Sequence, residues 1–502
     1  MSEQRKLESL WFEPAPWING QAIRGSSTVR ISNPATGSKL ADVYWGDAQL
    51  ATQAIDGAVQ SQRMWSQLSA YDRGNILKAI AGKLLLQRER YATLLTAEQG
   101  KPYWQALGEV DYAASFFQWF GEEARRLSGR IAPHPQGDRE FLIEHLPLGV
   151  AGWITPWNFP LAQGAKKIAA ALAAGCTGVW KPAESTPLIA LAMAPLFRDA
   201  GVPDGVIQIL PGGGSEIGTV FADHRDVRCI SVTGSKGTGS RVMAGAAAQV
   251  KRVSLELGGN APFIVLPDAD IDVAVDHLVQ LKLFVTGQVC VTANRIFVSD
   301  ELKEQFLECL RARLAQATVA DGLQDSQEQR VDAGPLIHHQ ACRGVENLVG
   351  EACATGARMV YRHDRTNSLS SSSNGSGVVN NGDGSFYSPV VLSDVNDSMR
   401  LAQSEIFGPV FPVYTYKSID EVVSRANGVP QGLAGYVYGT DLSLCRRVAR
   451  QLEVGIVGVN EWRPLKAEIP FGGIKESGIG AEGGQEGLLE YLRMRVVSLP
   501  KD

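Results

Sequence analysis

Short apolar runs alternate with longer amphipathic or Ala-rich segments over residues 148–257. Each run has the length of a strand, and each longer segment has the length of a helix. Strands that alternate with helices through short connections form a parallel sheet with helices on both faces. The pattern predicts strands at Gly149–Thr155, Thr177–Lys181, Val206–Leu210, Arg228–Val232 and Lys251–Leu257. It predicts helices near 163–174, 186–199, 215–223 and 238–248.

The regions on either side of this segment extend the pattern. Residues 45–130 are mainly helical in pattern, for example over Leu77–Glu98 and Glu109–Leu127. Residues 262–450 repeat the strand–helix alternation. We therefore predict an α/β protein, with a doubly wound parallel-sheet domain followed by a second α/β domain.

Three segments depart from the alternation. Residues 127–147 and 485–502 lie outside it, and the second of them contains the strand-like run Tyr491–Leu499. The segment Ser368–Ser385 is rich in Ser, Asn and Gly, which is typical of an exposed flexible insertion between strands. We assign no function to this insertion.

Composition narrows the class of protein. The 502 residues suffice for two or three domains, and 44% apolar with 20% charged residues is ordinary for a globular chain. A net charge of −5 without a basic stripe argues against a nucleic-acid partner. No run approaches the ~18 apolar residues of a membrane helix, and the first residues lack the apolar centre of a secretion signal. These features predict a cytoplasmic enzyme without a membrane partner.

The cysteines argue for reactivity at one position only. The chain has seven cysteines at irregular spacings and no Cys-x-x-Cys pair, so zinc sites and disulfide frameworks are both disfavoured. We expect no metal, and we expect most of the thiols to be small buried side chains. Cys290 differs because of its neighbours in Thr286–Val291, which reads TGQVCV.

Two other segments carry groups that a nucleophilic cysteine needs. Glu256 precedes a Gly-Gly turn in LELGG, and Asn158 lies in the Pro/aromatic turn TPWNFP. A thiol, a carboxylate and a side-chain amide supply a nucleophile, a general base and an oxyanion donor for attack on a carbonyl carbon. Taken singly, Glu256 is also interpretable as a strand-end salt bridge and Asn158 as a turn-forming side chain.

Together these segments resemble the aldehyde dehydrogenase superfamily, over a span from about Trp17 to Pro500. The resemblance implies NAD(P)-dependent oxidation of an aldehyde to its carboxylic acid through a cysteine thiohemiacetal and a thioester. Cys290 would attack, the Asn158 amide and the Cys290 N–H would hold the oxyanion, and Glu256 would activate water. Relatives that transfer the acyl group to coenzyme A lack this carboxylate, so Glu256 favours a free acid. An acylating dehydrogenase or esterase, and a non-catalytic structural family member, stay as alternatives.

The resemblance also divides the chain into parts. It implies an NAD-binding domain over 1–126 and 148–257, a catalytic domain over 258–481, and a small bridging β arm over 127–147 and 482–502. In the family the arm pairs with a second subunit, which implies a homodimer or homotetramer. Glu482 matches a carboxylate sometimes invoked as a second proton relay.

We expect the cofactor beyond the carboxyl ends of the parallel strands. Ser231–Ser235 follows a strand and opens a helix, so its Gly234 turn offers N–H groups and a positive helix end to a phosphate. Such a junction is common without any ligand, and the resemblance is what makes it a pyrophosphate contact. By resemblance Lys181 and Glu184 hold the adenosine ribose. A carboxylate there repels a 2′-phosphate, so we expect NAD rather than NADP. The predicted cofactor contacts are Thr155, Pro156, Trp157, Lys181, Glu184, Gly234, Ser235, Leu257, Glu405 and Phe407.

Within the superfamily the chain most resembles succinate-semialdehyde dehydrogenases, except where substrate is chosen. Those enzymes hold the distal carboxylate with two arginines and a serine, which align here with Lys166, Phe284 and Leu465. A bidentate arginine contact is lost when Phe replaces it. We therefore expect a bulky aromatic or extended aldehyde, with a dicarboxylic semialdehyde such as succinate semialdehyde as the alternative, because Lys166 and Arg463 could still meet an acidic group. The predicted pocket residues are Phe117, Phe159, Lys166, Phe284, Trp462, Arg463 and Leu465.

Overall fold

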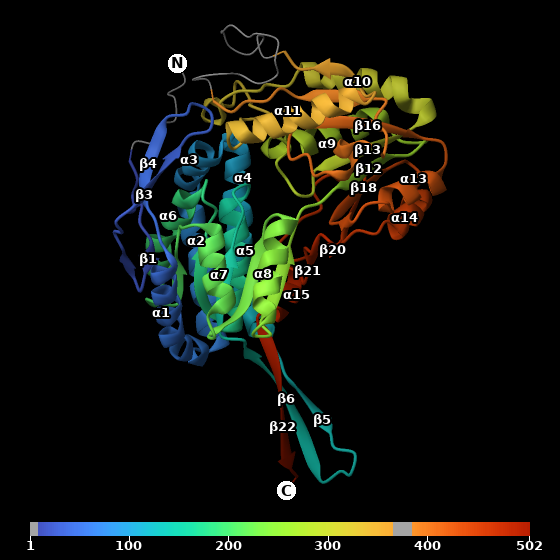
Figure 1. The fold of residues 1–502 in the computed structure, drawn as a ribbon. Helices are drawn as coiled ribbons and strands as arrows, with labels where there is room; N and C mark the ends of the chain where they lie inside the picture. Colours follow the sequence, from blue (N-terminus) through green and yellow to red (C-terminus); the bar gives the residue numbers. More distant parts are fainter. Residues whose placement is uncertain (1–8, 365–383, 502) are drawn as a thin grey trace.

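The computed structural model describes residues 9–364 and 384–501, and it forms two layered α/β halves with a projecting β arm (Figure 1). The α/β class predicted from the sequence is confirmed. The Ser/Asn/Gly-rich segment 368–385 lies outside the described residues, except for its last two. Within the described ranges, no helix is both long enough and apolar enough to cross a membrane.

The first sheet is the doubly wound one. Its strands are β1 Trp17–Ile18, β2 Gln21–Ala22, β7 Val150–Ile154, β8 Thr177–Lys181, β9 Ile207–Ile209, β10 Val227–Thr233, β11 Arg252–Glu256 and β21 Gly478–Ile479. They lie in the order β2-β1-β9-β8-β7-β10-β11-β21. The five central strands are parallel, and the strands at the two edges pair antiparallel. Because β21 comes from the predicted catalytic segment, the two halves share this sheet edge, and the domain boundaries stay a prediction.

Helices cover both faces of this sheet. They are α1 Ala48–Gln67, α2 Ala70–Leu86, α3 Arg88–Gln99, α4 Tyr103–Glu123, α5 Pro160–Ala174, α6 Pro187–Asp199, α7 Gly214–Asp223 and α8 Lys236–Ala247. Successive side chains of a strand point to opposite faces. In β7, Ile154 belongs to the apolar layer with α1, α7 and α8, whereas Trp153 belongs to the layer with α2 to α6. The near-continuous apolar runs of the sequence reflect burial on both sides.

The second sheet repeats this construction. Its strands are β12 Ala261–Val265, β13 Ala293–Ser299, β14 Arg358–Arg362, β15 Val390–Ser393, β16 Val410–Tyr416, β18 Ala434–Tyr438 and β19 Ile456–Val459, in the order β14-β15-β16-β13-β12-β18-β19. Only β14 is antiparallel to its neighbour. One face packs against α9 Ile271–Leu283 and α10 Lys303–Ala315. The other face packs against α11 His339–Ala354, α12 Arg400–Gln403, α13 Ile419–Asn427 and α14 Leu442–Gln451.

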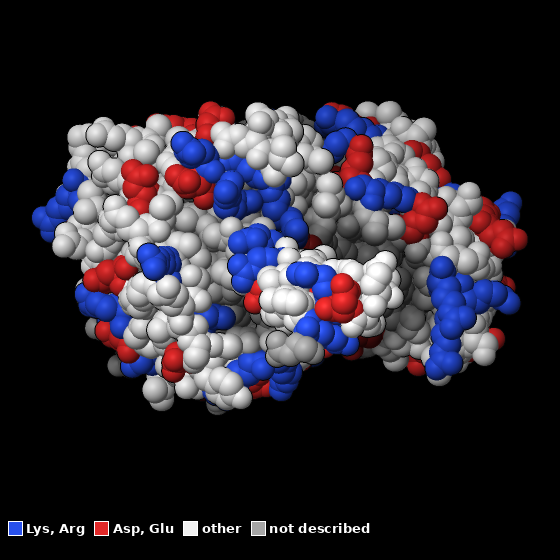
Figure 2. Space-filling view, turned by 90° about the horizontal axis from the view of Figure 1, so that it is seen from below, with Lys and Arg blue, Asp and Glu red and all other residues white. Residues whose placement is uncertain are grey.

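The arm is a three-stranded antiparallel sheet. It consists of β5 Arg130–Pro133, β6 Arg139–Pro147 and β22 Leu492–Pro500, with β6 in the centre. The strand predicted at Tyr491–Leu499 is therefore confirmed. The arm exposes large apolar side chains, including Ile131, Met494 and Val496. In the view along the arm (Figure 2), Lys and Arg side chains gather beside its base, where an open hollow is lined by Arg228, Lys251, Arg252 and Arg493.

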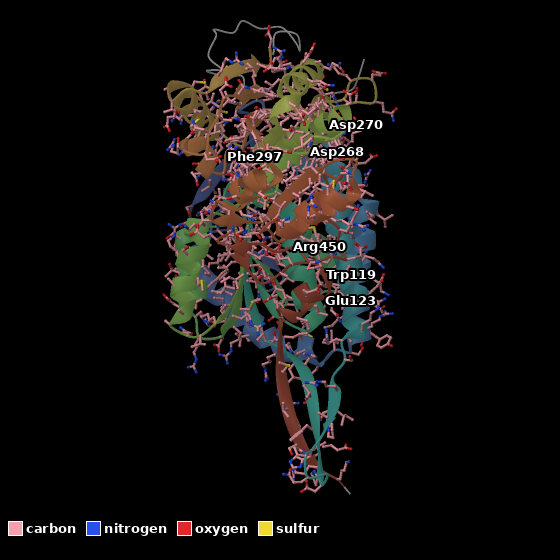
Figure 3. The ribbon with its side chains drawn as sticks, turned by 90° about the vertical axis from the view of Figure 1, so that its right-hand side faces the viewer. Trp119, Glu123, Asp268, Asp270, Phe297 and Arg450 are labelled. Atoms are coloured by element: carbon pink, nitrogen blue, oxygen red, sulfur yellow. The ribbon has the colours of Figure 1, made fainter. Side chains whose placement is uncertain are left out.

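Smaller elements complete the chain. They are β3 Thr28–Ser32, β4 Lys39–Tyr44, β17 Gln431–Gly432, β20 Ile474–Lys475, α15 Gly484–Leu489 and the 3-10 turns η1 Ala124–Arg126, η2 Phe284–Gly287, η3 Asp300–Leu302 and η4 Gly322–Gln324. Side-chain hydrogen bonds fasten distant segments to one another, and Figure 3 labels two of the side chains involved, Trp119 and Asp268. Trp119 of α4 donates its indole N–H to the carbonyl O of Gly484 at 3.2 Å. Asp268, after β12, accepts from the N–H groups of Thr440 and Asp441 at 2.9 and 2.6 Å.

The predicted elements of residues 148–257 agree closely with the structure. The five strands are confirmed to within one residue at either end. The helical prediction over Leu77–Glu98 needs a correction, because two helices occupy this region and meet at Gln87. The break lets both helices bury a side chain, Leu84 on α2 and Tyr91 on α3, while Leu86 at the corner is 86% exposed.

Candidate active site

Three neighbouring strand ends bring predicted catalytic groups and predicted cofactor contacts together. β7 ends shortly before Asn158, β10 leads into the turn 234–235, and Glu256 is the last residue of β11. Because these strands are parallel neighbours, their carboxyl ends open at one edge of the sheet. A Cβ on Gly259 would lie 2.3 Å from the carbonyl O of Cys290. Glycine at this position therefore lets the end of β11 approach the loop that carries the thiol.

The nucleophile loop, residues 284–292, has a strained backbone. Val285 and Thr286 have φ values of 48° and 56°, which are unusual for β-branched residues. Two contacts from other segments hold this conformation. The N–H of Val285 donates to Oε1 of Gln105 at 2.8 Å, and the hydroxyl of Thr286 donates to the carbonyl O of Gly334 at 3.0 Å.

Cys290 lies where two cavities meet. We name them the inner cavity, lined by residues that include Lys166, Phe284 and Arg463, and the middle cavity, lined by residues that include Asn158, Glu256 and Glu405. Both include Cys290 in their walls. An outer cavity of about 490 Å³ continues from the middle one through shared walls at Pro156, Trp157, Gly234 and Ser235. One molecule can therefore approach the thiol through the outer and middle cavities while another occupies the inner cavity.

The outer cavity takes its polar groups from strand ends and helix starts. Lys181, at the end of β8, lies 2.7 Å from Glu184, which also accepts from the N–H of Gly214 at the start of α7. Partial burial would raise the pKa of Glu184, but Lys181 and these hydrogen bonds outweigh it and hold the pKa below its ordinary value. Ser235 caps the first turn of α8 in the same wall. A fixed carboxylate and a helix N-terminus suit a ribose and a pyrophosphate respectively.

Asn158 presents an amide donor beside the thiol. Its Nδ2 donates to the carbonyl O of Gln288 at 2.9 Å, and its Oδ1 accepts from the N–H of Phe159 at 3.0 Å. Nδ2 carries two N–H groups. No described residue accepts from the second one, which leaves it available in the cavity that contains Cys290.

The other wall of the middle cavity comes from the second half of the chain. Glu405 accepts from the N–H of Gly259 at 3.2 Å, and burial raises its pKa to about 7. Phe407 meets Trp157 edge to face, with ring centroids 5.4 Å apart. All ten predicted cofactor contacts thus lie in the walls of the outer and middle cavities, and their roles as contacts stay a prediction.

The thiol and the carboxyl group favour their neutral forms in this site. Burial raises the pKa of Cys290 to about 12, and the nearby carboxyl of Glu405 adds to this shift. Burial also raises the pKa of Glu256 well above its ordinary value, with the charge of Glu482 as the second cause. Among the described residues, neither carboxyl oxygen of Glu256 has a hydrogen-bond partner. Charge in a bound ligand would therefore have a large influence on both groups.

A buried group of charges lies behind Glu256. Glu482 forms an ion pair with Lys167, which also donates to the hydroxyl of Ser231 at 2.9 Å. The ammonium of Lys166 lies 3.7 Å from the second oxygen of Glu482 and 3.9 Å above the ring of Phe471. Burial alone would lower the pKa of Lys166, but Tyr112 and Glu482 outweigh it and the net shift is upward. Lys166 is therefore a charged group in the wall of the inner cavity.

Aromatic rings form the rest of the inner cavity. Phe284 packs against Phe159 and Trp462, with ring centroids 5.7 and 6.0 Å apart. The guanidinium of Arg463 lies 5.1 Å from the centre of the Phe284 ring. The cavity therefore combines apolar walls with two cationic groups, Lys166 and Arg463.

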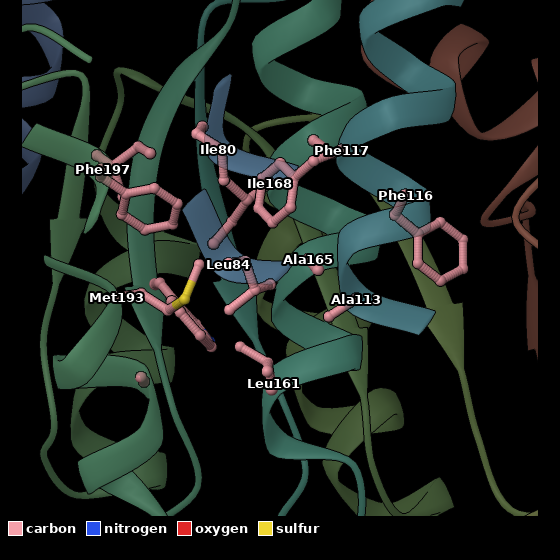
Figure 4. Packing of buried hydrophobic residues seen from close by; sticks show 14 of the residues in the cluster. Ile80, Leu84, Ala113, Phe116, Phe117, Leu161, Ala165, Ile168, Met193 and Phe197 are labelled. Atoms are coloured by element: carbon pink, nitrogen blue, oxygen red, sulfur yellow. The ribbon is translucent and has the colours of Figure 1, made fainter. Parts of the chain in front are cut away.

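One prediction for the pocket is wrong, because Phe117 does not line the inner cavity. Phe117 is fully buried in the helical layer, and Figure 4 shows it turned towards Ile168 and Phe197 and away from the side of α4 that carries Phe116. Residues four apart share a helix face, so Tyr112 and Phe116 lie together and Phe117 is rotated from them. Tyr112 is the residue of this helix that lines the inner cavity. The other six predicted pocket residues line it as well.

Comparison with known proteins gives the site a family. The model of the aldehyde dehydrogenase family matches residues 17–497. The chain belongs to the aldehyde dehydrogenase family. An NADP(+) succinate-semialdehyde dehydrogenase of Escherichia coli is 39% identical over 98% of this chain and 99% of that protein. The 3-sulfolactaldehyde dehydrogenase of Pseudomonas putida is 40% identical over 98% of this chain and 97% of that protein. A crystal structure of betaine aldehyde dehydrogenase from Staphylococcus aureus in complex with NAD+ has a TM-score of 0.92 at 34% identity, covering 99% of this chain and 98% of that one.

This aldehyde dehydrogenase has a site that fits the family's NAD(P) cofactor. The outer cavity offers Lys181, Glu184 and the first turn of α8, and it leads directly to the middle cavity beside Cys290. Oxidised nicotinamide supplies a positively charged acceptor for hydride. A dinucleotide that enters from the outer cavity therefore has a path to the thiol without filling the inner cavity.

Sequence reasoning missed several residues of this dehydrogenase's cavities. Gly214 and Arg241 line the outer cavity, and Gln163, Tyr436 and Phe471 line the inner one. Phe471 belongs to Pro470–Gly478, PFGGIKESG, a stretch that also resembles the succinate-semialdehyde dehydrogenases, so its place could have been inferred. Tyr436 is a residue of a buried strand, and nothing in its local sequence separates it from core.

Proposed function

We propose that this aldehyde dehydrogenase oxidises an aldehyde with an acidic group at its far end to the corresponding acid. The main support is Lys166, a buried and charged ammonium in the wall of the cavity that contains Cys290. By their names, two relatives act on succinate semialdehyde and 3-sulfolactaldehyde, both of which have an acidic far end. The sequence favoured a bulky aldehyde and kept a dicarboxylic semialdehyde as the alternative. The proposal reverses that order.

The proposed first half-reaction uses Cys290 and Asn158. The thiol of Cys290 gives its proton to solvent, and the thiolate attacks the carbonyl carbon to form a tetrahedral thiohemiacetal anion. The free N–H of Asn158 and the backbone N–H of Cys290 donate to the new oxyanion, and one such donor is typically worth ~10²–10³ in rate. An oxidised nicotinamide held in the middle cavity by Trp157, Glu405 and Phe407 would supply the acceptor for the hydride that leaves this carbon. A thioester on Cys290 remains.

The proposed second half-reaction uses Glu256. Its deprotonated carboxylate takes a proton from water as the water attacks the thioester, and it returns this proton to the departing sulfur, so that the carboxylic acid and the free thiol are released. Glu256 suits this step because it is buried beside the thiol and carries no other hydrogen bond among the described residues. A carboxylate at this position supports hydrolysis over transfer to coenzyme A, and over a non-catalytic family member.

The size of the inner cavity supports a slender substrate. It leaves about 70 Å³ of room, and one water needs roughly 10–15 Å³ on this measure. A chain of a few carbon atoms with a terminal acid fits this space. A larger group requires movement of Phe284 or Trp462.

A bulky neutral aldehyde is the second candidate. The observation in its favour is the apolar wall formed by Phe159, Phe284, Trp462 and Leu465, since burial of apolar surface contributes ~25 cal/mol per Å². This wall also suits the methylene groups of an acidic substrate, so it does not decide between the two candidates.

A panel that varies charge and bulk separately tests the proposal. Succinate semialdehyde and butanal share a chain length, and 4-formylbenzoate and benzaldehyde share a ring. We expect kcat/KM to be about 10- to 100-fold higher for the acidic member of the first pair, because a charge-assisted hydrogen bond is worth ~1.5–3 kcal/mol. Higher values for both neutral aldehydes would favour the second candidate. No turnover of any aldehyde would contradict the enzymatic assignment itself.

We also propose NAD as the preferred cofactor, on the strength of Glu184. Its carboxylate is held in the outer cavity by Lys181 and the Gly214 N–H, where it can accept from ribose hydroxyl groups and repels a 2′-phosphate. The E. coli relative is named as an NADP(+) enzyme, so the family alone does not decide this point. The ratio of kcat/KM for NAD and NADP tests it.

The arm is the proposed assembly surface, as the family resemblance implies. Its exposed Ile131, Met494 and Val496 would be covered by a second copy of the chain. Sedimentation of the purified protein tests this, with a dimer or tetramer expected and a monomer contradicting it.

A further inference from the structure

A fully buried ion pair lies at the start of α4, outside the cavities described above. The ammonium of Lys101 pairs with the carboxylate of Glu109, and neither side chain exposes any surface. Taking two charges out of water is costly, and a buried pair is often no more stabilising than apolar residues of similar volume. Stability alone is thus a weak account of this pair, and its contacts indicate another role.

Both members of the pair contact the segment that carries the oxyanion donor. Lys101 donates to the backbone carbonyl O of Asn158 at 2.7 Å and lies 4.2 Å above the ring of Phe159. Glu109 accepts from the N–H groups of Leu161 and Ala162 at 3.0 and 3.1 Å, in the first turn of α5. The N-cap residue Phe159 makes no side-chain cap of its own. The pair therefore holds the backbone of Asn158, through its carbonyl oxygen and through the helix that follows it.

The segment from Lys101 to Glu109 also contacts the nucleophile loop. Gln105 lies between Lys101 and Glu109 in sequence, and its Oε1 accepts from the strained Val285 while its Nε2 donates to the carbonyl O of Asp332 at 3.1 Å. Residues 101–109 are thus hydrogen-bonded both to the segment that carries Asn158 and to the loop that carries Cys290. Rigid support of this kind sets the distance between two groups that act on the carbon and the oxygen of one carbonyl group.

We propose that Lys101 and Glu109 are positioning residues that hold Asn158 where its free N–H meets the oxyanion. The inference rests on the proposed function, because it assumes the oxyanion role of Asn158. Lys101 orients the Asn158 peptide through its carbonyl oxygen, and Glu109 anchors the helix that follows. The side chain of Asn158 is bonded to Gln288 on the far side, so a shift of the peptide would alter the aim of the amide.

A matched control exists in the same layer. Glu98 is also buried, and it accepts from Leu188 and Ile189 at the first turn of α6. It therefore stabilises a helix start as Glu109 does, but α6 carries none of the proposed catalytic groups. A loss of helix anchoring alone should have the same kinetic effect in Glu98→Gln as in Glu109→Gln.

The experiment measures hydride transfer in a single turnover, as the appearance of reduced cofactor after rapid mixing with aldehyde. The variants are Lys101→Met, Glu109→Gln and the double variant, which leaves no uncompensated buried charge and keeps the test open if a single variant fails to fold. We expect hydride transfer to slow at least about tenfold, with cofactor affinity and aldehyde KM little changed. Glu98→Gln should lower the thermal unfolding midpoint without slowing hydride transfer.

Combining the Lys101→Met/Glu109→Gln double variant with Asn158→Ala shows whether the pair acts on hydride transfer through Asn158. If the pair acts through Asn158, adding the double substitution to Asn158→Ala should cause no further slowing of hydride transfer. A full additional loss, or parent-like hydride transfer in the folded double variant, would overturn the inference. If Asn158→Ala itself transfers hydride at the parent rate, the failure lies in the proposed oxyanion role, and the inference falls with it.

Discussion

The outer and inner cavities are built in opposite ways. The outer cavity is assembled from strand ends and helix starts, such as the end of β8 at Lys181 and the capped start of α8 at Ser235. The inner cavity is assembled from side chains of α4, α5, the end of α9 with the nucleophile loop that follows it, β18 and the segment 462–471. The outer cavity depends on the backbone geometry of strand ends and helix starts, which short local motifs determine. The inner cavity depends on how five distant segments meet, so a small change of residue alters what it binds.

Cys290→Ser should have the largest effect, because Cys290 is the proposed nucleophile and lines both the inner cavity and the middle cavity, which continues into the outer one. We expect turnover to fall at least about 10⁴-fold, as for removal of other catalytic nucleophiles, while NAD(P) affinity stays near that of the parent. Steady-state rates and equilibrium cofactor binding measure the two quantities. Substantial turnover in the variant would remove the nucleophile assignment.

Glu256→Gln should separate the two halves of the reaction in time. Hydride transfer precedes water attack, so the variant should give a burst of reduced cofactor followed by a steady state slower by about 10²- to 10⁴-fold. A rapid-mixing trace measures both phases. A trace with neither a burst nor a slower steady state would contradict the role of Glu256 as the base.

Lys166→Met should change the selectivity of the inner cavity without changing the outer one. We expect kcat/KM to fall about 10- to 100-fold for succinate semialdehyde, in line with a lost charge-assisted bond of ~1.5–3 kcal/mol, and to change little for butanal. Lys466→Met is the matched control, because Lys466 is exposed and does not line the cavity. Equal losses for both aldehydes would mean that Lys166 acts through Glu482 and not on substrate.

Glu184→Ser should change the outer cavity alone. Removal of the carboxylate should lower the ratio of kcat/KM for NAD over NADP by about tenfold, which corresponds to about 1.4 kcal/mol. The aldehyde selectivity of the enzyme should not move. A parent enzyme that already prefers NADP would show that the carboxylate does not select the cofactor.

The smallest effect should be a displaced pH profile in Glu482→Gln. Glu256 acts as a base only when it is deprotonated, so the deacylation rate should fall as pH falls through its raised pKa. Because the charge of Glu482 raises that pKa, the substitution should lower it and extend deacylation to more acidic pH. The pH dependence of the slow phase after the burst measures this, and a displacement to more alkaline pH would contradict the coupling.

The sequence predicted the backbone of this enzyme better than its side-chain walls. The strands β7 to β11 followed from near-continuous apolar runs, because a strand buried on both faces leaves a local signal. The positions of Asn158, Glu256 and Cys290 followed from motifs at strand ends and in a glycine-flanked loop. The prediction for Phe117 was wrong because the local sequence around an aromatic residue on a helix does not show which neighbouring element the ring faces. The Lys101–Glu109 pair also escaped notice, since its meaning depends on a contact with a residue 57 positions away.

The burial of the Cys290 thiol has a consequence for damage by oxidants. Peroxides attack thiolates and not thiols, and they drive them towards sulfenic and higher acids. Because burial and the carboxyl of Glu405 raise the pKa of this thiol, the resting enzyme holds Cys290 mainly as the protonated thiol at neutral pH. A positively charged nicotinamide in the middle cavity would favour the thiolate. Inactivation by peroxide should therefore be faster for the enzyme with oxidised cofactor bound than for the enzyme without cofactor.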